Sequence, residues 1–457
     1  MDTIMKKTVM ALFIGGALAA PAVWAQNSTA TLEQRMLLLE QRLQAAETRA
    51  QNAEKEIRQL KQAGPAPQAA PAVAVVSATP AADTQHNRAA PSLKLSGFGD
   101  LKFYGDVEFN MDAESRKGAL IGDRDNDNEK WDINGRILLG FDGYRTLDNG
   151  HFAGFTAQPL ADMTGSMNLD DAAFFFGREN DWKIKIGRFE AFDMFPLNQD
   201  TFIQHSGDTA NDLYDDGHGY IYMMKEARGR SDSGGNFLVS KQLDNWYFEV
   251  NTLVENGSSL FVDGNYHGRK LTNDKNVVYV RPVISWTQDA LSLSAAMESN
   301  LVNNAYGYYN QQGSWVDQSK RNGYGAVLTW NGLKNDPDNG VVLNLNTAYL
   351  DASGEKDFSA GVNALWKRFE LGYIYAHNKI EQFDQRGLAE CEDGCWITDT
   401  GTYDIHTVHA SYQIPNIMEM QNFNIYLGTY WSWLNEKGGD DGSQDRYGAR
   451  VRFKYFF

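Results

Sequence analysis

The sequence predicts an all-β protein: a transmembrane antiparallel β-barrel of about 16 strands (16–18), preceded by an N-terminal α-helical coiled coil. Three observations predict the barrel. Residues 92–457 alternate between apolar and polar side chains in short segments, as strands with two different faces do. Tight turns and long polar stretches alternate between these segments, and tryptophans recur beside the tight turns. No apolar run of about 18 residues follows the first 25 residues, which excludes a helical membrane protein.

The last segment, 446–457, shows the alternation most clearly. One face is apolar and holds Tyr447, Ala449, Val451, Phe453, Tyr455 and Phe457. The other face is basic and carries Arg450, Arg452 and Lys454. In a barrel, the apolar face meets lipid and the polar face lines a lumen, whereas a soluble edge strand turns its polar face to water. A strand that ends in aromatic residues is typical of bacterial outer-membrane barrels, which favours the barrel.

The first 91 residues divide into three predicted segments. Residues 1–25 have the basic start, the short apolar run and the small-x-small site (Val23-Trp24-Ala25) of a secretory signal peptide. Residues 26–63 are predicted to form a periplasmic coiled coil, and residues 64–91, which contain five prolines, an exposed linker. Export would place the mature chain in an oxidising compartment.

The coiled coil is predicted from apolar residues spaced alternately by four and three. They are Leu32, Met36, Leu39, Leu43, Ala46, Ala50, Ala53, Ile57 and Leu60. Glutamates and arginines flank this seam and could pair between parallel helices. Because three of the central residues are alanines, we expect the coil to assist assembly rather than to cause it. A single amphipathic helix lying on a surface is the alternative.

Residues 92–457 are predicted to form the barrel. The clearest strands are 93–109, 131–143, 182–189, 246–255, 276–286, 290–300, 341–350, 358–366, 369–379, 423–433 and 446–457. Weaker ones are 151–161, 167–178, 236–243, 322–330 and 403–413. Five tryptophans, Trp182, Trp246, Trp286, Trp330 and Trp366, lie beside short connections on the apolar faces. Their repeated position predicts one aromatic girdle at a membrane interface.

Turning the apolar faces outward leaves a polar interior, which predicts an aqueous pore because sixteen strands enclose a channel. The longest loop, about 190–235, carries aromatic and acidic residues and is predicted to fold into the barrel and narrow it. A solvated external loop is the alternative. The candidate substrate contacts are Phe195, Tyr220, Tyr222, Asp215 and Asp216 on this loop and Arg136, Arg450, Arg452 and Lys454 on the wall. Loop carboxylates facing the basic wall would create a transverse field.

Together, the signal peptide, coiled coil, Pro/Ala linker and Phe-ended barrel resemble the carbohydrate-selective outer-membrane porins, in particular the raffinose-type glycoporins. The resemblance implies a trimeric channel for the uptake of oligosaccharides, such as raffinose-like or sucrose-like sugars, with ions also passing. Its expected partners are oligosaccharide solutes, outer-membrane lipid and lipopolysaccharide, and further copies of the chain. A general ion-conducting porin is the alternative, because the basic ladder suits it equally. The maltoporin group has eighteen strands and matches less well. We therefore assign no residue of this chain to the aromatic slide of that group.

The remaining patterns point to no other function. A net charge of -17 argues against nucleic-acid binding. No nucleophile elbow, phosphate loop or H-E-x-x-H motif is present, so we expect no enzyme, no cofactor and no metal site. The acidic residues at 123–129 are spaced by two as in half a calcium loop, but Asn128 replaces the required glycine, which favours a solvated acidic loop. Cys391 and Cys395 are expected to form a disulfide within a long loop.

Overall fold

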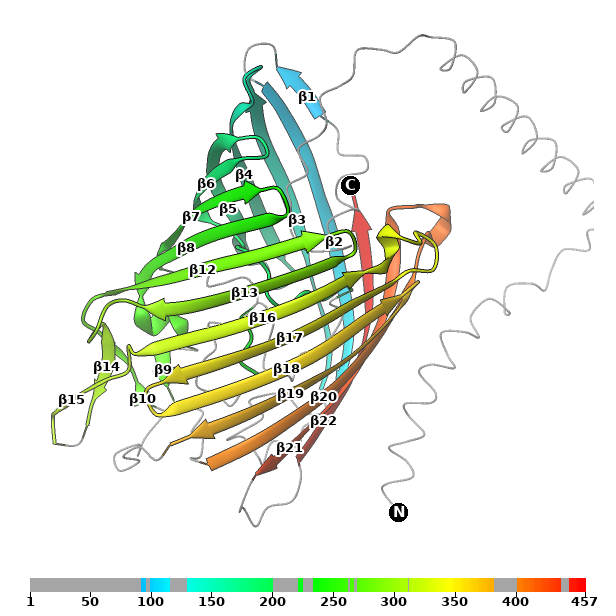
Figure 1. The fold of residues 1–457 in the computed structure, drawn as a ribbon. Helices are drawn as coiled ribbons and strands as arrows, with labels where there is room; N and C mark the ends of the chain where they lie inside the picture. The colour runs from blue at the N-terminus through cyan, green and yellow to red at the C-terminus, as the bar shows by residue number, and fades with distance from the viewer. Residues whose placement is uncertain are drawn as a thin grey trace, which may run out of the picture. The chain divides into compact units, whose positions relative to one another are not determined.

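The computed structural model describes residues 92–95, 99–115, 130–199, 221–224, 233–261, 264–266, 269–310, 312–381, 401–436 and 444–457. Sixteen strands in these ranges form one closed antiparallel barrel (Figure 1). The predicted fold class is therefore confirmed, with sixteen strands rather than eighteen. The signal peptide, the coiled coil and the linker lie outside the described residues and stay predictions. In the described part of the chain, no helix has the length and apolar character needed to cross a membrane.

Each barrel strand pairs with the next, and the last pairs with the first. In order they are β2 (Gly99–Glu114), β3 (Lys130–Thr146), β4 (His151–Asp162), β5 (Met167–Arg178), β6 (Trp182–Arg188), β7 (Gly235–Leu243), β8 (Trp246–Asn256), β12 (Asn276–Gln288), β13 (Leu291–Asn300), β16 (Arg321–Asn331), β17 (Val341–Ala352), β18 (Glu355–Trp366), β19 (Phe369–Ile380), β20 (Gly401–Ile414), β21 (Phe423–Glu436) and β22 (Gln444–Phe456). All sixteen overlap the predicted segments.

The short elements lie in the connections. They are the strands β9 (Asn265–Tyr266), β10 (Arg269–Lys270), β11 (Thr272–Asn273), β14 (Tyr306–Tyr309) and β15 (Trp315–Asp317), and the 3-10 helices η1 (Gly257–Leu260), η3 (Gly332–Lys334) and η4 (Ile417–Glu419). One further strand corrects a prediction. The segment 93–109 is not one strand, because β1 (Ser92–Leu95) folds back antiparallel on the start of β2. Gly99, the first residue of β2, has a φ of 108°, which residues with a Cβ rarely adopt.

Most tight turns lie at one end of the barrel, the short-turn end, whereas the two-residue turn at 353–354 between β17 and β18 lies at the other end. The first residue of the two-residue turns at 244–245, 289–290 and 367–368 has a positive φ, as does Asn180 in the turn between β5 and β6. Asn and Asp tolerate this conformation well, which explains three of the four positions. The fourth is Lys367, whose Nζ lies 5.0 Å from the ring centroid of Trp366.

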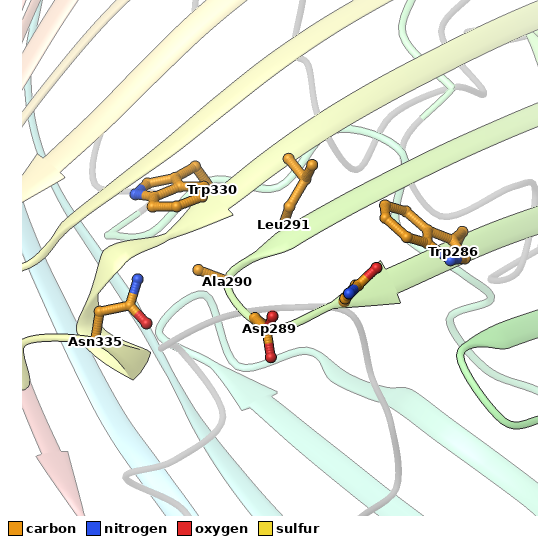
Figure 2. A pocket seen from close by; sticks show the side chains of 7 residues that line it. Trp286, Asp289, Ala290, Leu291, Trp330 and Asn335 are labelled. Atoms are coloured by element: carbon orange, nitrogen blue, oxygen red, sulfur yellow. The ribbon is translucent and has the colours of Figure 1, made fainter.

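The predicted tryptophan girdle is confirmed at the short-turn end. Trp246 and Trp286 are direct register partners, and Trp246, Trp330 and Trp366 are more than two-fifths exposed on the outward face. Figure 2 shows Trp286 and Trp330 on either side of the β12–β13 turn, where they line a shallow pocket together with Leu291. This pocket lies on the outer face at the girdle, so it is not part of the lumen.

The barrel closes at a glycine. Backbone N–H and C=O groups of Gly105 and Phe457 pair with each other, with both N···O distances at 3.0 Å. A Cβ on Gly105 would lie 2.3 Å from the carbonyl oxygen of Leu138 and 2.6 Å from Cζ of Phe457. The closing seam between β2 and β22 therefore has no room for a side chain at this position.

We expect Gly105→Ala to destabilise the barrel by about 1–3 kcal/mol, because an added methyl group forces the backbone of the seam apart. Urea unfolding in detergent micelles, followed by tryptophan fluorescence, measures this loss. Gly235→Ala in β7 is the matched control, since the nearest atom to its Cβ is 3.9 Å away. Equal unfolding midpoints for the two variants would contradict the expectation.

Candidate functional site

The lumen wall has the polar character that the strand parity predicts. Polar residues on neighbouring strands face inward as register partners, such as Asn344 opposite Asn363, and successive inward positions of β8 hold Glu249 and Asn251. These four side chains are buried although each ends in a polar group. His406 and His409 lie on opposite faces of β20: His406 stacks on the outward Trp433 at 4.9 Å between ring centroids, and His409 is buried.

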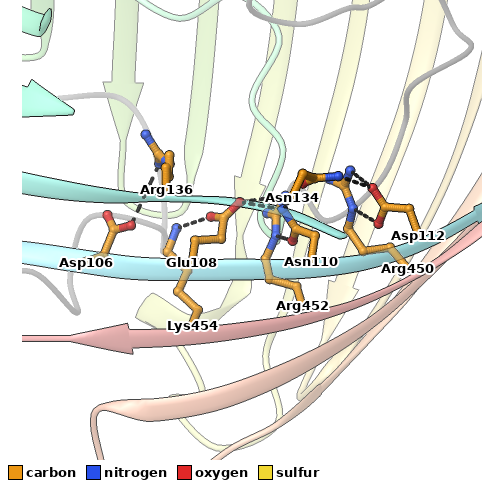
Figure 3. Close-up of polar contacts among 9 residues, drawn as sticks. All are labelled: Asp106, Glu108, Asn110, Asp112, Asn134, Arg136, Arg450, Arg452 and Lys454. Carbon is orange, nitrogen blue, oxygen red and sulfur yellow. Dashed lines mark hydrogen bonds and ion pairs between the residues drawn. The ribbon is translucent and has the colours of Figure 1, made fainter. Parts of the chain in front are cut away.

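A ladder of ion pairs joins β22 to β2 inside the barrel (Figure 3). Arg450 makes a bidentate pair with Asp112, with Nε and Nη2 each 2.7 Å from a carboxylate oxygen. Nη2 of Arg452 lies 3.1 Å from Oε1 of Glu108, and Nζ of Lys454 lies 3.3 Å from Oε2 of the same carboxylate. Strand register causes this arrangement, because alternate residues of two paired strands face the lumen together.

Two asparagines connect the rungs of this ladder. Asn110 accepts a hydrogen bond from Nε of Arg452 at 2.9 Å and donates to Asn134 on β3 at 2.8 Å. Asn134 in turn donates to Asp112 at 2.8 Å. The network therefore spans β22, β2 and β3, and Asn134 donates to the same Asp112 oxygen, Oδ2, that Nη2 of Arg450 contacts (Figure 3). Such cross-linked, charge-assisted bonds hold the side chains in one arrangement.

Arg136 on β3 extends the network along the wall. Its Nη2 lies 4.0 Å from Asp106 and its Nη1 lies 3.8 Å from Asp170 on β5. Together with the three basic residues of β22, it places four cations opposite four carboxylates on this wall. This part of the wall is therefore dense in charge, with each of these groups beside a partner of opposite sign. It offers hydrogen-bond donors and acceptors close together.

Among the described residues, the partners of the basic wall are the strand residues Asp106, Glu108, Asp112 and Asp170. The loop residue Asp193 accepts a hydrogen bond from the backbone N–H of Phe195 at 2.7 Å. The loop carboxylates Asp215 and Asp216 lie outside the described residues, so their predicted position facing the wall stays a prediction.

The described parts of the long loop, 189–199 and 221–224, lie inside the barrel. The loop enters along β8 and β12, where the N–H of Phe192 donates to Glu249 at 3.2 Å. The Phe192 ring stacks on the lumen-facing Tyr247 at 5.6 Å, and Arg281 donates to the carbonyl oxygen of Phe192. A carboxylate and a guanidinium group therefore hold the loop backbone at this point.

The loop then crosses to β18 and β19. Glu370 accepts from the N–H groups of Asn198 at 3.0 Å and Gln199 at 2.6 Å. The side chain of Asn198 donates to Asn363 at 2.6 Å. Beside these bonds, Phe195 is buried against inward-facing apolar residues that include Ile374. Polar and apolar contacts together fix this part of the loop against one side of the lumen.

The returning segment is also attached to the wall. Tyr222 is fully buried, and its hydroxyl donates to Glu298 on β13 at 2.8 Å. Gly323 and Gly325 on β16 make room for it: a Cβ on Gly323 would lie 1.9 Å from the Tyr222 hydroxyl oxygen, and one on Gly325 would lie 3.3 Å from Cβ of Met224. Small residues on the wall therefore receive the large side chains of the loop.

These contacts change the roles of two predicted residues. Phe195 and Tyr222 were expected to present their rings to a passing solute, but they are 3% and 0% exposed. Their rings are covered on both sides by wall and loop, so they anchor the loop. Tyr220, Asp215, Asp216, Cys391 and Cys395 lie outside the described residues, and the expectations placed on them stay predictions. Arg136, Arg450, Arg452 and Lys454 do face the lumen, and the four are partly exposed.

Sequence reasoning missed the residues that hold the loop, namely Glu249, Arg281, Glu298 and Glu370. A signal for them exists, since each is a charged residue at an inward position of a predicted strand. Their partners are groups of the loop far away in the chain, however. Glu370 and Asn198 are 172 residues apart, and no local pattern connects them.

Comparisons with known proteins agree with this architecture. Residues 103–457 match the model of the family described as porin-like glycoporin RafY. Among solved structures, OmpF of Salmonella typhi in complex with daunomycin aligns with a TM-score of 0.51 and 14% identity, over 80% of this chain and 100% of that chain. The anion-selective porin from Comamonas acidovorans aligns with a TM-score of 0.48 and 15% identity, over 78% and 99% of the two chains. OprB of Pseudomonas putida aligns with a TM-score of 0.47 and 10% identity, over 78% and 94%. No curated protein matches.

Proposed function

The chain belongs to the family of porin-like glycoporins represented by RafY, and on this premise we propose that it takes up oligosaccharides. It is a porin, an outer-membrane diffusion channel. The short-turn end of such a barrel faces the periplasm and the long loops face outward. The proposed solutes are raffinose-like or sucrose-like sugars, which pass the lumen passively together with ions.

The network of paired charges on the lumen wall is the observation that carries this proposal. In it, four cations and four carboxylates of β2, β3, β5 and β22 each lie within 4.0 Å of a partner of opposite charge. The hydroxyl groups of a neutral sugar can exchange hydrogen bonds with these carboxylates, guanidinium groups and amides. The side chains of Arg450, Arg452 and Lys454 remain 12–18% exposed, so they are accessible for such exchange.

The inward loop supports the proposal in a second way. Its described parts contact inward-facing residues from β5 and β7 through to β20, which narrows the path. Solute binding must remain weak, because a channel that holds its solute tightly does not pass it. We expect millimolar affinity or weaker, on the order of 4 kcal/mol or less.

Swelling of proteoliposomes tests the proposal. Vesicles containing the protein are diluted into isotonic solutions of raffinose, sucrose or a polyethylene glycol of similar size. If the channel selects sugars, the sugars should enter faster than the glycol, which offers ether oxygens but no hydroxyl-bearing rings. Equal rates for sugars and glycol would instead assign the protein to the alternative, a general ion-conducting porin that sorts by size.

We also propose that the barrel forms a homotrimer in contact with outer-membrane lipid and lipopolysaccharide, and that the predicted coiled coil assists assembly. Deleting residues 26–91 should then leave trimers, with a lower thermal midpoint of dissociation, because the alanine-rich seam is too thin to carry the assembly alone. Light scattering of the detergent-solubilised variant gives its mass. A strictly monomeric variant would refute this role for the coil.

A further inference from the structure

Three lumen-facing aromatic side chains lie on β2, β4 and β5, and each lies over a glycine of the neighbouring strand. Phe175 on β5 is the register partner of Gly154 on β4, and Phe152 on β4 is the partner of Gly177 on β5. Tyr104 on β2 is the partner of Gly140 on β3 in the same way. On β4, Phe152 is followed at the next inward position by Gly154, and on β5 the glycine and the phenylalanine stand in the reverse order opposite them. Each ring therefore has a glycine beside it both along its own strand and across on the neighbouring strand.

The glycines allow the rings to lie along the wall. A Cβ on Gly154 would lie 2.7 Å from Cε2 of Phe175, and a Cβ on Gly177 would lie 3.0 Å from Cζ of Phe152. Each ring therefore occupies the space that a neighbouring side chain would fill, an arrangement known to compensate for glycine in sheets. The Phe152 and Phe175 rings have centroids 6.3 Å apart and are inclined to each other by 55°.

Tyr144 on β3 extends the two rings into a continuous surface, which we name the aromatic platform (Tyr144, Phe152 and Phe175). Its ring centroid lies 5.8 Å from that of Phe152 and 6.3 Å from that of Phe175, with interplanar angles of 31° and 34°. All three side chains are only partly buried. Tyr144 and Phe175 lie near the ends of β3 and β5, and Phe152 lies at the start of β4, so the platform is at the short-turn, periplasmic end of the lumen.

Polar groups surround the aromatic platform. The hydroxyl of Tyr144 donates to Glu179 at 3.2 Å, and Nζ of Lys183 on β6 lies 5.5 Å from the ring centroid of Phe175. On the far side, Tyr104 donates to Asp142 at 3.1 Å and accepts from Gln158 at 2.8 Å. Flat apolar ring faces bordered by donors and acceptors match a ligand with an apolar face and a polar edge.

We propose that the aromatic platform is a binding subsite for one pyranose ring of the oligosaccharide, on the periplasmic side of the narrowed lumen. This inference rests on the proposed function and adds the location of the site. The C–H groups on the face of a sugar ring contact the aromatic faces, while its hydroxyl groups reach Glu179, Lys183 and Asp142. A subsite at this end holds the solute after it has passed the charged ladder and favours its release into the periplasm.

Block of ion current by raffinose in planar bilayers tests the subsite. The test variant is Phe152→Leu combined with Phe175→Leu, which keeps apolar volume but removes the flat ring faces. The matched control is Phe174→Leu combined with Phe176→Leu, on the outward face of β5. Current is normalised to the sugar-free current of each variant. We expect the half-blocking concentration to rise about tenfold in the test variant, since two stacking contacts of about 0.7 kcal/mol each are lost. The control should match the wild type.

The outcomes separate this inference from the proposed function. If raffinose does not block the wild type, the proposed function fails. If it blocks the wild type and the Leu variant equally, the aromatic platform is wrong while the channel remains a sugar porin. Phe152→Tyr with Phe175→Tyr should retain the block, because the ring faces remain. If the Leu double variant does not fold, the block by raffinose is compared between Tyr144→Leu and Tyr144→Phe. Equal half-blocking concentrations for these two variants would overturn the proposal.

Discussion

Replacing Arg450 by methionine is expected to destabilise the barrel by about 3–5 kcal/mol, because it leaves the buried carboxylate of Asp112 without its bidentate partner. Asp112 is 2% exposed and receives two hydrogen bonds of 2.7 Å from Arg450. Asn134 also donates to Asp112, but a neutral amide does not balance the charge. Urea unfolding in micelles measures the loss.

A control variant and a double variant show whether the stability is lost because a buried charge is unpaired or because packing is lost. Lys241→Met removes an ion pair with Asp181 at the exposed short-turn end, so it should cost less than about 1 kcal/mol. Combining Asp112→Asn with Arg450→Met removes both charges and should recover most of the lost stability. If the double variant is as unstable as Arg450→Met alone, the loss comes from packing, and the ion-pair account of the wall is wrong.

Replacing Glu370 by alanine is expected to increase the single-channel current and its noise. This carboxylate accepts from the backbone of Asn198 and Gln199 and from the side chain of Asn363. Without it, buried N–H groups of the loop lose their acceptors, at about 1.5–3 kcal/mol for each bond to a charged group. The loop should then leave the wall for part of the time, and the lumen should widen and fluctuate.

Planar-bilayer recording measures both quantities. Glu381→Ala is the matched control, because Glu381 lies just after β19, is about half exposed and pairs with the exposed Lys379. It should change neither the current nor its noise. A current through Glu370→Ala that equals that of the wild type would show that this anchor does not hold the loop in the conducting channel.

The sequence was sufficient to predict the strands and their two faces, because both follow from a local period of two. All sixteen segments overlap observed strands, and the tryptophans mark the short-turn end. The error at 93–109 arose at Gly99, whose positive φ follows the reversal between β1 and β2. A continuous alternating pattern does not reveal such a reversal.

The site was predictable only in part, because its contacts depend on register between distant residues. The inward positions of Arg450 and Lys454 follow from parity, but their pairing with Asp112 and Glu108 needs the closure of β22 on β2. The aromatic content of the loop indicated an inward course without showing which rings would be buried. Phe195 illustrates this, because the apolar residues that cover it include Ile374, which lies far along the chain on β19.

The central claim is that this porin binds sugar weakly in a narrowed lumen, and titrating raffinose against the current of single wild-type channels tests it most directly. The account predicts a fall in current that saturates with sugar concentration, with half-block at millimolar concentration or above. Brief interruptions of the current should mark individual binding events. A current that falls only in proportion to the bulk conductivity of the sugar solution, without saturation, would contradict the claim.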